Sequence, residues 1–222
     1  LKRAKIFACL HAPERISTQI TDLFTNLIRP QFPSCGKLER IEPKPLFKAR
    51  ENATIVVDRK EVKWERLVYN AAAVRIKGIT YVLYRALGYD GISRIGLWWS
   101  KDGINEDGRL DYPIFGPEED YEVPKNLKEK QEEQLEKEGI IHEVGGTEDP
   151  RVTIIDGNMY MTYTAYGDMC QMGLARIKVK DFVKAVKKAG SYEDWKRLWK
   201  REGIILPGID DKDVVIFPEL FD

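Results

Sequence analysis

Residues 145–167 read GGTEDPRVTIIDGNMYMTYTAYG and place a possible proton donor beside a fixed positive charge. Glu148 and Asp149 are adjacent acids, and Arg151 follows them after a proline. A turn with a purely structural role uses Gly, Pro, Asn or Asp and has no need of a Glu-Asp-Pro-Arg order. The stretch is therefore a candidate catalytic site, whose chemistry depends on the elements that surround it.

Composition excludes several classes of function. Lys and Arg total 36, as do Asp and Glu, so the formal net charge is zero, which argues against an electrostatic nucleic-acid or membrane role. The three cysteines lack metal-ligand spacing and there are only two histidines, so we expect no metal, no cofactor and free thiols in a reducing, cytoplasmic compartment. No apolar run approaches the roughly 20 residues of a membrane span, and the apolar core of the N-terminus is too weak for a signal peptide.

Two segments of the chain repeat each other, one starting at Ala73 and the other at Arg151. Four identities share an offset of 79 residues, and two more share an offset of 77 after a gap in a loop. The pairs are Gly78 with Gly157, Tyr81 with Tyr160, Tyr84 with Tyr163, Ala86 with Ala165, Gly96 with Gly173 and Leu97 with Leu174. Six identities in the same order, with a single gap, argue against two unrelated hairpins.

Each copy reads as strand, tight turn, strand, loop, strand. Val74 and Ile76 alternate with charged residues before a turn at Lys77–Gly78, and the run ITYVLYRA that follows is rich in β-branched and aromatic residues. Strand-turn-strand units at a long fixed period are typical of a β-propeller. The sequence therefore predicts an all-β propeller.

Other segments are predicted to be additions to this repeat. Residues 124–139 are a charged helix former with almost no apolar face, and the segment from Asp181 to Gly203 suggests two short amphipathic helical stretches. Residues 1–36 are expected to be an N-terminal extension, partly helical over Pro13 to Ile28, and residues 37–222 the propeller. The tail DKDVVIFPELFD resembles the strand that precedes another copy, so we expect about three blades of an incomplete ring, and the chain to be a fragment or one piece of a split gene.

Six motifs, in order, resemble family 130 of the glycoside hydrolases, the β-mannoside phosphorylases and related mannosidases. They are WERLVYNAAAV, YVLYRALGYDGISRIGL, WSKDGI, GGTEDPRV, YMTYTAYG and DDKDVVIFPE, and the resemblance as a whole covers the chain from about Leu38 to the end. The resemblance implies a five-bladed β-propeller with a central substrate cleft.

The resemblance also implies a reaction, the inverting phosphorolysis of β-mannosyl linkages to α-mannose 1-phosphate. Inorganic phosphate is the co-substrate and the nucleophile, so a single protein acid is sufficient, whereas ordinary inverting hydrolysis needs two carboxylates. By resemblance Asp149 is that general acid, and its proton passes to the glycosidic oxygen through a sugar hydroxyl. The family's further phosphate ligands have no counterpart in this sequence, which leaves the choice between phosphorolysis and hydrolysis open.

Further residues match the family one at a time. Residues implied to contact the sugar are Asn70, Arg85, Ser100, Asp102, Glu148 and Tyr163, and those implied to bind phosphate are Arg151 and Lys212. An Arg can hold a carboxylate or phosphate through two hydrogen bonds, and a Lys is a compact charge suited to one phosphate oxygen. The expected partners are a β-mannosyl oligosaccharide and phosphate, with homo-oligomerisation possible.

Plainer interpretations exist for each of these residues. Asp149 could cap a turn before Pro150, Arg85 and Arg151 could be buried partners of carboxylates, and Asp102 could shape the Lys-Asp-Gly turn. The repeated tyrosines are mostly expected in the blade cores.

Two other functions compete with the phosphorylase. One is a non-catalytic propeller piece that binds carbohydrate or a partner chain. The other is one of the remaining five-bladed glycosidase families, which the order of the motifs disfavours.

Overall fold

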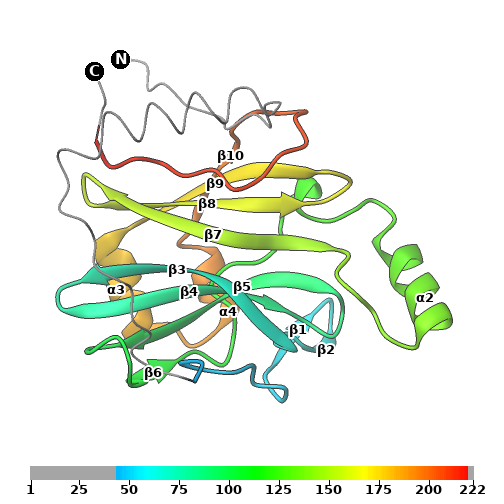
Figure 1. Cartoon of the computed structure of the whole chain (residues 1–222), viewed down its shortest axis with the longest axis horizontal. Coiled ribbons are helices and arrows are strands. Elements are labelled where there is room, and N and C mark those ends of the chain that lie inside the picture. The colour runs from blue at the N-terminus through cyan, green and yellow to red at the C-terminus, as the bar shows by residue number, and fades with distance from the viewer. Residues whose placement is uncertain (1–43, 220–222) are drawn as a thin grey trace, which may run out of the picture. The chain divides into compact units, whose positions relative to one another are not determined.

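A single sheet of eight strands forms most of the unit that begins at Leu46 in the computed structural model (Figure 1). The structure describes residues 44–219, so the predicted extension over residues 1–36 and its helix lie outside the described residues. The sheet has two antiparallel halves. The first contains β3 (Leu67–Ile76), β4 (Ile79–Leu87), β5 (Ile92–Ser100) and β6 (Gly108–Arg109). The second contains β7 (Gly145–Ile155), β8 (Asn158–Tyr166), β9 (Cys170–Lys178) and β10 (Lys200–Ile204).

The two halves are the two copies found in the sequence. Each opens with a hairpin whose turn has positive φ at both central residues, 49° and 83° at Lys77–Gly78 and 49° and 74° at Asp156–Gly157. Such type I′ turns match the twist of the flanking strands, which is why Gly recurs there. A tyrosine of the second strand covers a glycine of the third strand in each copy, Tyr84 over Gly96 and Tyr163 over Gly173. A Cβ added to these glycines would come within 2.2 and 2.4 Å of the tyrosine ring. The predicted repeat is thus confirmed as two consecutive propeller blades.

The blades meet along their inner strands. β5 and β7 pair in parallel only at Ile92 with Gly145 and at Ser93 with Gly146, and β3 lies beside β7. A Cβ on Gly146 would lie 2.3 Å from the Ser93 carbonyl oxygen, so this approach requires a residue without a side chain. The glycine pair before Thr147 therefore allows the contact between the blades.

The tail of the chain lies along the second blade. Thr162 Oγ1 donates to the carbonyl oxygen of Val214 at 2.5 Å, and Thr153 Oγ1 to that of Ile216 at 2.6 Å. Arg151 bonds Asp213, so contacts advance along the tail and along β7 in the same direction. The segment thus runs parallel to β7, as the inner strand of a following blade would.

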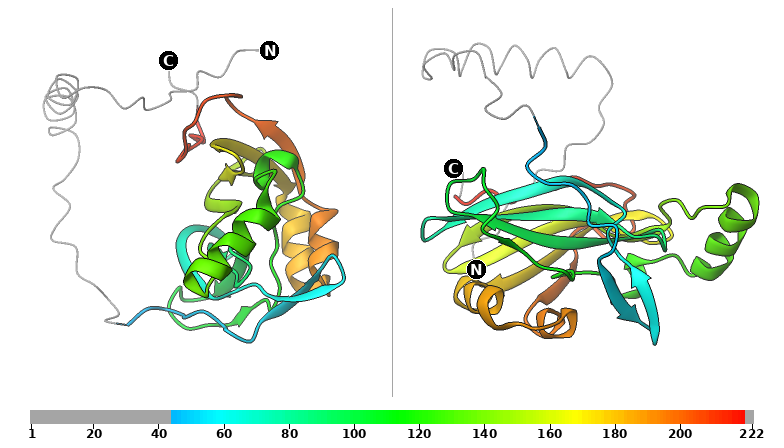
Figure 2. Two further views of the ribbon diagram at one scale, coloured as in Figure 1. Left: turned by 90° about the vertical axis from the view of Figure 1, so that its right-hand side faces the viewer. Right: turned by 90° about the horizontal axis from the view of Figure 1, so that it is seen from below.

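Helices and a small hairpin complete the unit. Outside the blades lie β1 (Thr54–Val57), β2 (Lys60–Lys63), the 3₁₀ helix η1 (Asp120–Glu122), α2 (Leu127–Glu138), α3 (Val179–Lys188) and α4 (Tyr192–Lys196). α2 has no buried residue and projects beyond one end of the blades, as its charge pattern predicted (Figure 2). α3 and α4 lie against one side of the sheet, where Phe182 packs edge-on to Tyr81 and against Trp195.

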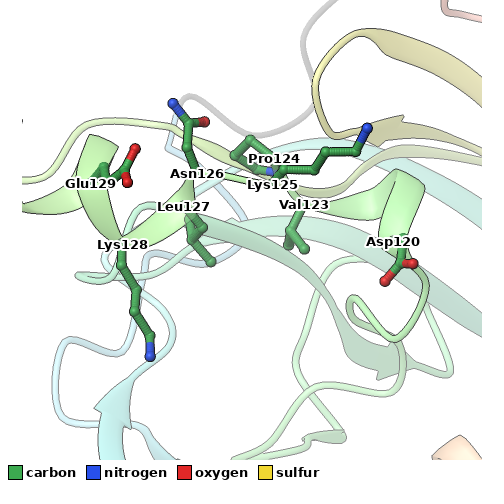
Figure 3. A pocket seen from close by; sticks show the side chains of 8 residues that line it. All are labelled: Asp120, Val123, Pro124, Lys125, Asn126, Leu127, Lys128 and Glu129. Atoms are coloured by element: carbon green, nitrogen blue, oxygen red, sulfur yellow. The ribbon is translucent and has the colours of Figure 1, made fainter.

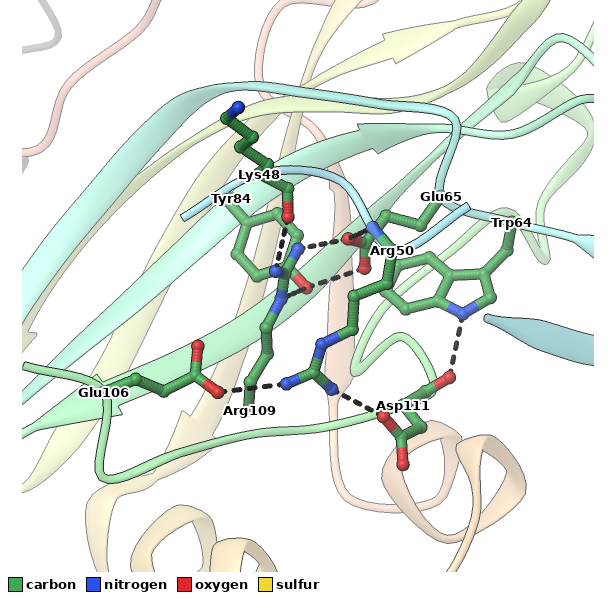
Figure 4. A network of polar contacts seen from close by, with 8 residues as sticks. All are labelled: Lys48, Arg50, Trp64, Glu65, Tyr84, Glu106, Arg109 and Asp111. Atoms are coloured by element: carbon green, nitrogen blue, oxygen red, sulfur yellow. Dashed lines mark hydrogen bonds and ion pairs between the residues drawn. The ribbon is translucent and has the colours of Figure 1, made fainter. Parts of the chain in front are cut away.

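A buried polar network supports the first blade and was missed by the sequence analysis (Figure 4). The Tyr84 hydroxyl donates to Glu65 Oε2 at 3.0 Å and accepts from Arg109 Nε at 3.0 Å. Arg109 also pairs with Glu65, and its guanidinium lies 4.6 Å from the ring of Phe47. Burial raises the pKa of Glu65, and the charge of Arg109 opposes that shift.

The second blade contains the same network built from other parts of the chain. Tyr163 donates to Glu122 Oε1 at 2.6 Å, and Arg201 Nε donates to the same oxygen at 3.0 Å. The guanidinium of Arg201 lies 4.2 Å from the ring of Phe115. On the outermost strands, Arg109 pairs with Trp98 and Arg201 pairs with Ala175. Trp98 and Ala175 are related by the 77-residue offset of the repeat, so the two arginines occupy equivalent positions in the two blades.

Candidate active site

Matching bulges in the two inner strands bring Asn70 and Asp149 together. The register shifts between Tyr69 and Ala71 in β3 and between Glu148 and Arg151 in β7. Asn70 and Asp149 are 79 residues apart and adopt left-handed φ angles of 44° and 48°, which short polar residues tolerate better than others. Asn70 Nδ2 donates to Asp149 Oδ1 at 2.8 Å. The bulges thus turn two equivalent side chains toward one point between the blades.

Arg85 is the centre of this cluster and is 6% exposed. Its Nη1 lies 3.2 Å from Asp149 Oδ1 and its Nη2 lies 2.7 Å from Glu148 Oε1. Nη2 also pairs with Glu143, and Nε donates to Ser93 Oγ at 3.1 Å. The ring of Tyr69 lies 4.7 Å from the guanidinium carbon. One cation from the first blade therefore holds three carboxylates that precede or begin the second.

Glu148 is the acid of this cluster whose pKa is raised. Its side chain is 6% exposed, and burial is the main cause that raises its pKa to about 8, with the charges of Glu143 and Asp149 adding to the shift. Arg85 and a hydrogen bond from Ser93 oppose the shift. Glu148 therefore binds a proton more readily than an exposed glutamate does.

The predicted phosphate ligands lie on the tail side of Asp149. Arg151 Nη1 donates to the carbonyl oxygens of Asp149 at 3.2 Å and Pro150 at 3.1 Å, while Nη2 pairs with Asp213 at 3.1 Å. Lys212 is exposed. Burial raises the pKa of the Cys170 thiol, the nearby charge of Glu148 adds to the shift, and that of Lys212 opposes it. Arg151 thus lies beside Asp149, and Lys212 is the exposed residue that precedes Asp213 on the tail.

Ser100 and Asp102 are not brought to this cluster, which corrects the expectation that they contact the sugar. Ser93 lies at the cluster end of β5, and Ser100 lies seven residues further along, roughly 23 Å away at 3.3 Å per residue. Ser100 Oγ donates to Asp102 Oδ1 at 2.8 Å. Asp102 also accepts from Asn105, whose side chain lowers the pKa of that carboxyl most. Asp102 therefore shapes the turn, as the plainer interpretation had it.

Tyr163 is also a correction. Its ring is 3% exposed and covers Gly173, and its hydroxyl is bonded to Glu122, so it packs the blade and is not open to a sugar.

Several members of the cluster were missed from the sequence. Glu143 was readable as an acid six residues before Asp149, but nothing in its spacing showed that its loop turns toward Arg85. Ser93 and Tyr69 carry no sequence signal of their own. Asp213 has a left-handed φ of 65°, like Asn70 and Asp149. The signal that could have identified it as part of the site was its position next to Lys212 in the sequence.

Other features of the described residues lie apart from the cluster. A surface hollow is lined by Asp120 and by residues 123–129, at the start of α2 (Figure 3). None of the predicted site residues lines it. Within residues 44–219 no group of His, Cys, Asp or Glu side chains is arranged to hold a metal ion. Among the same residues no helix has the length and apolarity to cross a membrane.

Curated relatives match most of the chain. A 1,2-beta-oligomannan phosphorylase of Thermoanaerobacter sp. (strain X514) is 31% identical over 191 residues, which cover 82% of this chain and 50% of the relative. A beta-1,2-mannobiose phosphorylase of the same strain is 32% identical over 130 residues, covering 52% of this chain and 36% of the relative. The chain thus spans about half the length, or less, of the curated relatives it matches.

Solved structures agree in fold. A family 130 structure, described as belonging to a family of mannoside phosphorylases that contains hydrolases targeting beta-1,2 mannosidic linkages in Candida mannan, superposes with a TM-score of 0.55 at 26% identity. That match covers 80% of this chain and 44% of the other. A glycosyl hydrolase from Bacteroides ovatus gives a TM-score of 0.56 at 24% identity, with the same coverage.

The sequence model of one family covers the blades and the tail together. It is described as beta-1,4-mannooligosaccharide phosphorylase and matches residues 37–218, more than half of the chain. The fold, a propeller of the five-bladed glycosidase type, agrees with that match. The chain therefore belongs to glycoside hydrolase family 130.

Proposed function

We propose that this chain supplies the acid-bearing part of a β-mannoside phosphorylase, with Asp149 as general acid and inorganic phosphate as nucleophile. The observation that carries the proposal is the buried carboxylate of Asp149, held by Arg85 and Asn70 of the neighbouring blade. Relatives named as mannoside phosphorylases support the substrate class.

The side-chain contacts of Asp149 engage one of its two carboxyl oxygens. Asn70 and Arg85 both bond Oδ1, so a proton on Oδ2 would point away from these donors. In the reaction a phosphate oxygen attacks the anomeric carbon, the bond to the leaving sugar oxygen breaks, and that oxygen receives the proton, directly or through a sugar hydroxyl. Because burial raises the pKa of Glu148 to about 8, this neighbour places less negative charge beside the acid than an exposed glutamate would.

Arg151 and Lys212 are proposed to receive the phosphate. Arg151 donates to the carbonyl oxygens of Asp149 and Pro150, so an anion on its guanidinium would lie close to the acid. Lys212 would add a second charge from the tail. A cytoplasmic location, homo-oligomerisation and the absence of nucleic-acid or membrane partners stay predictions.

The test supplies β-1,2- and β-1,4-mannobiose with and without phosphate and measures α-mannose 1-phosphate. We expect phosphate-dependent product. Asp149→Asn should lower turnover by about 10²–10⁴-fold, the usual contribution of a general acid, in a variant whose circular dichroism spectrum shows that it is still folded. Asp102→Asn is the matched control, because Asp102 lies at the far end of β5, and it should keep its activity.

Hydrolysis is the second candidate, since the family 130 structure at 26% identity is described with hydrolases. Mannose release that is equal with and without phosphate would establish hydrolysis in place of phosphorolysis. Retained activity in Asp149→Asn would show that another group is the acid.

A further inference from the structure

Three carboxylates share Arg85, but they differ in their access to solvent. The side chains of Glu148 and Asp149 are each 6% exposed and begin β7, whereas that of Glu143 is 36% exposed. Glu143 comes from the loop that joins α2 to β7. A ligand that approaches the cluster from solvent therefore meets Glu143 before the two buried acids.

The loop that carries Glu143 is held in place by several contacts. Val144 N donates to the Gly91 carbonyl oxygen at 2.8 Å, and Arg66 Nη1 donates to that of Ile141 at 2.8 Å. A Cβ on Gly91 would lie 2.2 Å from the carbonyl oxygen of His142, so the loop sits directly on this turn. The α2 insertion is tied to the same turn, because Gln131 Nε2 donates to the Asp90 carbonyl oxygen at 2.8 Å. The position of Glu143 is thus built by the fold.

A carboxylate in this position is suited to sugar hydroxyl groups. It accepts hydrogen bonds only, and bonds to an ionised acceptor are about twice as strong as neutral ones. Arg85 fixes the orientation of Glu143, while its partial exposure leaves it open to a ligand.

We propose that Glu143 is a specificity-determining residue of the sugar site, whose carboxylate binds hydroxyl groups of the substrate while it holds Arg85 against Glu148 and Asp149. The inference rests on the proposed function and deepens it, because it assigns sugar selection to the α2 insertion. The charge of Glu143 is also one of the causes that raise the pKa of Glu148.

The surroundings of Glu148 give a readout of the charge that Glu143 places in the cluster. The charged groups acting on it are Arg85, Glu143 and Asp149. Its own charge in turn raises the pKa values of Tyr69, Tyr166 and Cys170, for which burial is the main cause. Glu143→Gln removes one negative charge but keeps the shape, so the pKa of Glu148 falls and its proton is lost at lower pH.

The experiment compares wild type, Glu143→Gln and Glu132→Gln. Glu132 is an exposed residue of the same insertion, so its replacement makes the same charge change away from the cluster. We expect Glu143→Gln to raise KM for mannobiose about tenfold with little change in kcat, roughly the value of one charge-assisted hydrogen bond. The Glu148 carboxyl resonance, followed by ¹³C NMR and assigned with Glu148→Gln, should titrate at lower pH in Glu143→Gln only.

A further NMR arm does not depend on turnover. Addition of mannobiose should shift the Glu143 carboxyl resonance of the wild type. If wild type turns over no mannoside and this shift is still seen, the proposed reaction fails and the inference about Glu143 stands. An unchanged KM in Glu143→Gln, or no shift of the Glu143 resonance with mannobiose, would overturn the inference.

Discussion

The first and second blades share their buried frame and differ at their bulges. In both, a tyrosine covers a glycine of the third strand and donates to a buried glutamate that is paired with an arginine of the outermost strand. At the bulge, the first blade has Tyr69–Asn70 and the second has Glu148–Asp149. In the strand that follows the bulge, Arg85 of β4 in the first blade corresponds to Thr164 of β8 in the second.

The difference shows how a repeated fold acquires a single site. The frame needs the same packing in each copy, because each blade must fill the same space. The bulges turn side chains toward the space between the blades and are free to vary, so the acid comes from one blade and the cation from the other. Neither copy alone holds the complete cluster.

The largest expected effect comes from breaking the shared frame. Arg109→Met leaves the buried Glu65 without its cation and should cost about 3–5 kcal/mol of unfolding free energy. Arg201→Met should cost less, because the side chain of Arg201 is 10% exposed and that of Arg109 only 2%. Urea unfolding midpoints would measure both changes.

Arg176→Met is the control for these variants. Arg176 pairs with Glu202 on the surface, and such exposed pairs contribute about 0–1 kcal/mol. If Arg109→Met were no more destabilising than Arg176→Met, the frame would not be what stabilises the first blade.

The next largest effect is a pH dependence of stability, which we expect from the bulge with Glu148 and Asp149 and not from the bulge with Tyr69 and Asn70. Because the pKa of Glu148 is raised from 4.5 to about 8, its contribution to stability is fully present below about pH 4.5 and is lost as the pH rises through 8. Glu148→Gln should remove this dependence, which is on the order of a few kcal/mol at most. Unfolding midpoints measured from pH 4 to 9 would show a flatter profile for the variant.

Asn70→Gln is a useful comparison for that titration, because it changes the neutral bulge without altering a charge. The unfolding midpoint of Asn70→Gln should change with pH as steeply as that of the wild type. A slope in Glu148→Gln equal to that of wild type would mean that Glu148 does not hold the proton.

The smallest expected effect tests whether the two blades are equally packed. Gly96→Ala and Gly173→Ala would each push a Cβ into a tyrosine ring and should each cost about 1–3 kcal/mol. Gly190→Ala is the control, since the nearest group to its Cβ is the Asp194 carboxylate at 3.9 Å. Clearly unequal costs at Gly96 and Gly173 would show that the copies are less alike than their geometry suggests.

Sequence alone predicted the blades better than it predicted the site. The identities at Gly78 and Gly157, and at Tyr84 and Tyr163, located the hairpins, because turns and close packing demand particular residue types. The same tyrosine was wrongly offered as a sugar contact, since the sequence does not say which face of a strand is covered. Ser100 and Asp102 were misplaced for a related reason, because a motif does not reveal at which end of a long strand it lies.

By itself the sequence determined the repeat, the all-β class and the acid-containing stretch around Asp149, because residue types and their spacing are local properties of the chain. Only the tertiary structure decided that Arg85 lies beside Asp149 at a separation of 64 residues and that Glu143 joins them. It also decided that the pKa of Glu148 is raised, since burial and neighbouring charge set a pKa and both arise when the two blades meet.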